Sequence, residues 1–95
     1  MTSFVLTFRN ASSYTPTADV GALWGQWFQE LGSAIVDPGS QVGATSTLGA
    51  APSGSVVSGY TVITADNLEA AVLLAKGCPG LKHGGAVEVG ELIAM

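Results

Sequence analysis

The last third of the chain has strand signals on both sides of a short helix signal, and this order constrains the fold more than any other feature. Residues 56–64 are rich in valine, isoleucine, threonine and tyrosine, which favour strands. Asp66 follows as an expected N-cap, with Glu69 three residues later as in a capping box. Gly77 is an expected helix stop, and residues 86–93 resume the strand pattern. Four apolar residues are expected on the buried face of this helix, namely Leu68, Ala71, Val72 and Ala75.

The first half of the chain shows a similar succession. Residues 4–9 are aromatic and aliphatic, and they end at the turn-prone residues 10–13, which predicts a strand. Thr15 and Pro16 suit the start of a helix, and Gly32 suits its left-handed end. Between them, apolar residues recur at spacings of three and four, which places them on one helical face: Val20, Leu23, Trp24, Trp27, Phe28 and Leu31.

The middle of the chain predicts an edge strand and a loop. Residues 35–43 contain Pro38, which cannot donate to a sheet ladder, so this strand belongs at an edge. Residues 44–55 contain only alanine, threonine, serine, leucine, glycine and proline and are expected to form a mobile loop. The complete order is βαββαβ. It predicts one α+β ferredoxin-like domain over residues 1–95, with a four-stranded antiparallel sheet and two helices on one face.

Strand alternation predicts which side chains lie on the face of the sheet that the helices leave open. Phe4, Leu6 and Phe8 alternate with more polar neighbours, so they are expected against the helices and Arg9 on the open face. Glu88 is expected on the same open face as Arg9. The strand over residues 56–64 cannot be phased, because Tyr60 and Val62 are matched on the opposite side by Val57 and Ile63.

The open face is mixed in character, and this suits the interior of a two-subunit barrel. A homodimer that buries this face around a small organic ligand is therefore expected, with Arg9, Tyr60 and Glu88 as ligand-binding residues. Because the isolated charge of Arg9 would be costly to bury, a carboxylate such as Glu88 or an anionic ligand is expected beside it.

Composition argues against several classes of partner. Three basic residues against seven acidic ones give a net charge of -4, so a nucleic-acid interface is not expected. No apolar run approaches the roughly 20 residues of a membrane span, and the start of the chain does not resemble a secretory signal. A cytoplasmic location is expected. Cys78 is the single cysteine, so an internal disulfide is excluded and a packing role is expected.

The candidate catalytic residues are few. His83 is the only histidine and therefore the natural candidate for a general acid or base. It also lies in a glycine-flanked loop, where a solvated histidine without a catalytic role is commonplace. Asp37 is a candidate to orient His83 or to bind a ligand amine, but Asp before Pro-Gly is also common turn chemistry. His83, Asp37, Glu88 and Cys78 have no recognised ligand spacing, so neither a metal nor a cofactor is expected.

The combined order of these segments resembles the YCII-related (DGPF-domain) family over nearly the whole chain. The resemblance rests on residues 4–9, Trp24-x-x-Trp27, Leu31-Gly32, residues 35–39, residues 59–65, residues 75–79 and residues 84–89. It implies a dimeric α/β barrel with a cleft, and no function common to the whole family. Residues 51–58 depart from the family's Asp-Gly-Pro-aromatic segment and carry no charge. A function that depends on carboxylates in that segment is therefore not expected.

Two classes of function follow from these observations. The first is a small dimeric protein that binds an organic ligand in a cleft. An extended form of this hypothesis adds weak lyase-like or isomerase-like acid–base catalysis by His83, Arg9 and Glu88. The second is a noncatalytic accessory or regulatory module that binds another protein through its dimer surface or through residues 44–55.

Overall fold

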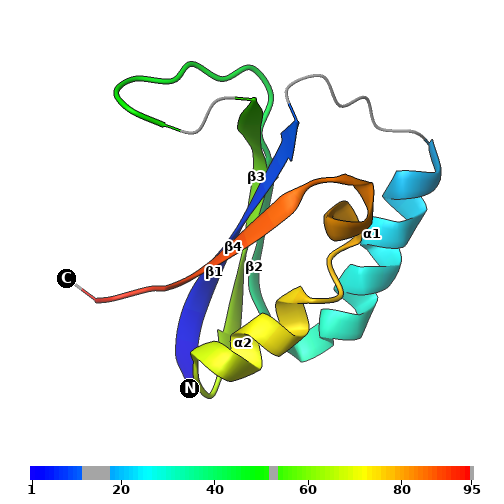
Figure 1. Ribbon diagram of the computed structural model, residues 1–95. Helices are drawn as coiled ribbons and strands as arrows, with labels where there is room; N and C mark the ends of the chain where they lie inside the picture. The colour runs from blue at the N-terminus through cyan, green and yellow to red at the C-terminus, as the bar shows by residue number, and fades with distance from the viewer. Residues whose placement is uncertain (12–17, 52–53, 95) are drawn as a thin grey trace.

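The computed structural model of the chain describes residues 1–11, 18–51 and 54–94. Its elements, in chain order, are β1 (Thr2–Ala11), α1 (Ala18–Leu31), η1 (Gly32–Ala34), β2 (Ile35–Gln41), β3 (Ser55–Ala65), α2 (Leu68–Ala75), η2 (Pro79–His83) and β4 (Ala86–Glu91), where η denotes a 3-10 helix. The strands form one sheet in the order β2-β3-β1-β4, and neighbouring strands are antiparallel. Both helices lie on the same side of this sheet (Figure 1). The predicted ferredoxin-like α+β fold is confirmed.

The core lies between the helices and the sheet. Phe4, Leu6 and Phe8 of β1 are buried there, as their alternation predicts. From the helices, Trp27 and Leu31 of α1 and the two small residues Ala71 and Ala75 of α2 complete this core. In the predicted stripe of α1, Trp24 and Phe28 are half-buried and Leu23 is 39 % exposed, so Leu23 lies at its margin. Leu68 and Val72 of α2 are exposed, contrary to the prediction that they lie on a buried face.

A β-bulge explains why the alternation of β3 cannot be phased from its sequence. Phe8 of β1 lies opposite Gly59, but Arg9 lies opposite Val57, so Ser58 is an extra residue. An extra residue reverses the parity of a strand on its two sides. Beyond the bulge, Gly59, Thr61, Ile63 and Ala65 are buried against the helices. Tyr60 alternates with them, on the open face, and is 38 % exposed.

The edge strand β2 is also irregular. Its register against β3 shifts on either side of Asp37, and it carries the predicted proline within an edge strand. The Thr61 side chain is fully buried, and its hydroxyl donates a hydrogen bond to the Pro38 carbonyl at 3.0 Å. This bond ties the irregular segment of β2 to the central strand β3 and satisfies a polar group that would otherwise be costly to bury.

The helix ends differ in part from the predicted ones. Gly32 has φ +52, so the left-handed end of α1 is confirmed, whereas the predicted start at Thr15 and Pro16 lies outside the described residues. The N-cap of α2 is Asn67 and not Asp66, because α2 begins at Leu68 and the Asn67 Oδ1 atom accepts from the Ala70 amide at 2.8 Å. The predicted capping box is therefore wrong.

α2 ends at Ala75 with Lys76 as its C-cap, so the predicted helix stop at Gly77 is confirmed, although Gly77 does not have a positive φ. A Cβ at this position would lie 2.8 Å from the Trp27 Nε1 atom. The absence of a side chain leaves room for this indole, whose Nε1 donates to the Leu74 carbonyl of α2 at 3.2 Å. Gly77 therefore allows the Trp27 indole of α1 to pack against the end of α2.

Among the described residues, no helix has the length and apolar character needed to cross a membrane.

Candidate functional site

A large hollow lies between α1 and the irregular parts of β2 and β3. This hollow, the α1 pocket, has a volume of about 750 Å³. One wall is aromatic and consists of Phe8, Trp24 and Phe28, and the other is polar and includes Ser40, Gln41 and Ser58. Pockets of roughly 300–1,000 Å³ with mostly apolar walls and a few polar groups are typical of small-molecule sites.

The aromatic wall is held by edge-to-face contacts. The Phe8 and Trp24 ring centroids lie 4.8 Å apart with an interplanar angle of 78°. Trp24 and Phe28 also meet edge to face at 6.1 Å. Phe8 belongs to the sheet and is buried, whereas Trp24 belongs to α1 and is only half-buried. The Phe8 ring therefore packs against Trp24, and Trp24 keeps part of its surface exposed at the hollow.

The polar wall depends on two strand irregularities. Ser58 is the bulged residue of β3, and its carbonyl accepts from the Val42 amide at 2.9 Å. In β2, Gly39 has φ +77, and a Cβ there would overlap the Tyr60 carbonyl oxygen. Bulges redirect side chains and are frequent next to binding sites. Here both irregularities occur beside the same hollow, which Ser40, Ser58 and Tyr60 line.

The second hollow, the α2 groove, lies between α2 and the edge strand β4. It has a volume of about 440 Å³ and includes Leu68, Val72, Leu81 and Val87. Lys76 and Glu88 also border it. Leu68 and Val72 are exposed because they line this groove, whereas Ala71, Ala75 and the partly buried Leu74 of α2 pack against the core.

The two candidate catalytic residues are not brought together. His83 ends η2 directly before β4, whereas Asp37 lies in β2, and these strands form opposite edges of the sheet. The Asp37 Oδ1 atom accepts from the Gly39 amide at 2.8 Å, which is the turn chemistry that Asp-Pro-Gly favours. This hydrogen bond gives Asp37 a structural role in its own turn.

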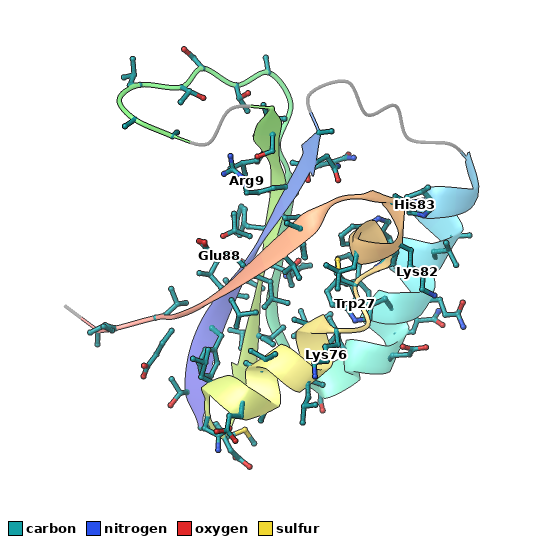
Figure 2. The ribbon with its side chains drawn as sticks, in the orientation of Figure 1. Arg9, Trp27, Lys76, Lys82, His83 and Glu88 are labelled. Carbon is teal, nitrogen blue, oxygen red and sulfur yellow. The ribbon has the colours of Figure 1, made fainter. Side chains whose placement is uncertain are left out.

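Arg9 and Glu88 share the open face of the sheet, as predicted, but they are not directly opposite. Glu88 faces Thr7, and Arg9 faces Ala86, so the two charged residues are diagonal neighbours. The Arg9 guanidinium donates from Nε to the Ser55 hydroxyl and from its Nη2 atom to the Ser55 carbonyl, both at 3.2 Å. Figure 2 shows Arg9 and Glu88 on the side of the sheet away from the helices, and His83 at the η2 turn beside α1.

Of the five predicted site residues, Tyr60 alone lines the α1 pocket, while Glu88 borders the α2 groove. The sequence predicts core or strand positions, and no binding role, for four of the residues that line this pocket, namely Phe8, Trp24, Phe28 and Gln41. Pro38-Gly39 within a strand pattern was the available signal, because such a pair indicates a bulge. Among the described residues, no group of three or more His, Cys, Asp or Glu is placed to hold a metal ion.

Cys78 is buried beside the pocket wall, with Gly80 between its sulfur and the Trp24 ring. Burial raises the pKa of the Cys78 thiol, while backbone hydrogen bonds from Gly80 and Leu81 partly oppose this rise. The reactive thiolate is therefore disfavoured in the folded protein.

We expect iodoacetamide to alkylate Cys78 much more slowly in the folded chain than in denaturant at about pH 8, because the thiolate is the nucleophile. A raised pKa also means that the folded state binds the thiol proton more tightly. Stability should therefore fall as pH rises above the unfolded thiol pKa and towards the folded one. Equal alkylation rates in the two states, measured by mass spectrometry, would contradict this assignment.

The chain matches no family model, no curated protein and no solved structure. The resemblance to the YCII-related family therefore stays a prediction, and the site is interpreted from its own geometry.

Proposed function

We propose that this protein binds a small organic molecule in the α1 pocket. The observation that carries the proposal is a hollow of about 750 Å³ with an aromatic wall on α1 and a polar wall where β2 and β3 are both irregular. Regular strands would bury more of this space, so the irregularities create and shape the pocket. Catalysis by His83 and Asp37 is not part of the proposal, because the two lie at opposite edges of the sheet.

Two glycines of α1 offer a matched test of this proposal. Gly21 lines the pocket, Gly25 does not, and a Cβ at either position would meet open space. Gly21→Leu should project a side chain into the pocket and weaken ligand binding strongly, whereas Gly25→Leu should leave binding unchanged. Both substitutions remove a helical glycine that costs about 1 kcal/mol relative to alanine, so neither is expected to unfold the chain.

The measurement is a two-dimensional NMR titration of labelled protein with a panel of metabolite-sized compounds. Binding should shift the backbone amides of Gly21 and Gly59 and the indole N–H of Trp24, which line the pocket. The proposal is wrong if no compound shifts these signals, or if the shifts persist unchanged in Gly21→Leu.

We also propose that the protein forms a homodimer in which the open sheet faces of two copies meet. Its support is the character of this face. Val5, Thr7, Val62 and Thr64 are only half-exposed, and two of the Arg9 donors are satisfied by hydrogen bonds to Ser55. Light scattering at micromolar concentration should give twice the chain mass.

A buried carboxylate should break this dimer, because two copies of the charge would meet at the interface. Val62→Glu places one on the open face opposite Val5, and Val36→Glu places one at an edge position that is 59 % exposed. We expect Val62→Glu to be monomeric and Val36→Glu to remain dimeric, with circular dichroism confirming that both are folded. A monomeric parent chain would contradict the dimer.

A noncatalytic protein-interaction module is the second candidate function. The α2 groove favours it, because Leu68 is 51 % exposed and Leu81 is 43 % exposed beside the outer edge of β4. The Gly21→Leu variant separates the two candidates, since it obstructs the α1 pocket and leaves the α2 groove unchanged.

A further inference from the structure

The described walls of the α1 pocket are uncharged. None of the described residues that line it is Asp, Glu, Lys, Arg or His. Its polar groups are neutral amides and hydroxyls, including those of Asn10, Ser40, Gln41 and Ser58.

We infer that the α1 pocket selects an uncharged, flat, ring-containing molecule with amide-like or hydroxyl hydrogen-bonding groups, and discriminates against carboxylates and amines of the same shape. This inference rests on the proposed function and specifies its ligand class. A charged group that leaves water for this pocket finds no opposite charge on the described walls, and unpaired charges are costly to bury.

The two walls of the pocket explain the preferred shape. Trp24 is half-buried and lines the pocket, so its ring offers apolar area to another flat ring. On the opposite wall, Gln41 pairs with the inward-facing Gly59, and its exposed side chain supplies a neutral donor and acceptor. An amide group on an aromatic ring satisfies both walls without bringing a charge.

The net charge of the chain adds to the discrimination against anions. A net charge of -4 disfavours the approach of an anion, and no lining lysine or arginine offsets it. A cation is attracted to the chain as a whole, but it finds no carboxylate among the lining residues. Neutral ligands avoid both penalties.

Benzamide, benzoate and benzylammonium provide a matched set of probes, because they share one ring and differ in charge. Their dissociation constants are measured by NMR titration of the full chain near neutral pH, using the Trp24 indole N–H and the Gly21 and Gly59 amides. We expect benzamide to bind about tenfold more tightly than either charged probe, given the cost of an unpaired charge in a partly enclosed site.

Gln41→Lys adds a positive charge to the pocket wall, and Gln29→Lys adds the same charge at an exposed position of α1 outside the wall. In Gln41→Lys, the affinity for benzoate relative to benzamide should rise about fivefold, as expected for a partly exposed ion pair. In Gln29→Lys, this ratio should stay at its original value.

The outcomes separate the inference from the proposed function. If all three probes bind equally and Gly21→Leu abolishes their binding, the pocket is a ligand site and the inference about charge is overturned. A preference for benzoate or benzylammonium in the unmodified chain overturns it too. If none of the probes or panel compounds shifts the pocket signals, the proposed function itself is wrong and the inference falls with it.

Discussion

Replacing Trp27 with alanine is expected to lower the free energy of unfolding by about 3–5 kcal/mol, the usual range for truncating a large core aromatic. Trp27 is only 3 % exposed, and its ring lies 5.5 Å from Trp24 and 5.9 Å from Phe8. Its Nε1 also joins α1 to α2 through the Leu74 carbonyl. The substitution therefore leaves a cavity and removes a contact between the helices. Chemical denaturation measures the change.

Two further variants divide this effect into its parts. Gln26→Ala changes an exposed neighbour in the same helix and should have little effect on stability. Trp27→Phe keeps an aromatic ring but loses the Nε1 donor, so the Leu74 carbonyl loses its side-chain partner and part of the destabilisation should remain. A loss below about 1 kcal/mol for Trp27→Ala would show that the side chain is not part of the core.

Gly39→Ala is expected to destabilise the chain by more than about 2 kcal/mol, because the left-handed conformation alone costs a side chain roughly 1–2 kcal/mol. Gly39 has φ +77, and the added Cβ would overlap the backbone of Tyr60 in the neighbouring strand. Relief of this overlap requires β2 to move away from β3, which would also disturb the Thr61–Pro38 hydrogen bond.

Gly49→Ala is the matched control for Gly39→Ala. Gly49 has φ +78, but a Cβ there would meet no atom within 4 Å. The two variants thus share the conformational cost, and only Gly39→Ala has the overlap. Chemical denaturation should show a clearly larger loss for Gly39→Ala. Equal losses would mean that the close approach of β2 to β3 contributes nothing to stability.

The candidate site was much less accessible from the sequence than the fold. His83 and Asp37 were paired on chemistry alone, and the strand order places them at opposite edges of the sheet. Arg9 and Glu88 were placed on the correct face, because strand parity is a local property. Their diagonal offset depends on the register between β1 and β4, which local alternation does not specify.

The sequence by itself determined the order of strands and helices, the inward face of β1 and the left-handed end of α1 at Gly32. These features follow from hydrophobic periodicity and from glycine's freedom at positive φ, both of which act over a few residues. The tertiary structure alone decided the phase of β3, because the extra residue at Ser58 is defined by its pairing with β1. It also decided the α1 pocket, since a hollow between α1 and two irregular strands depends on how separate elements pack.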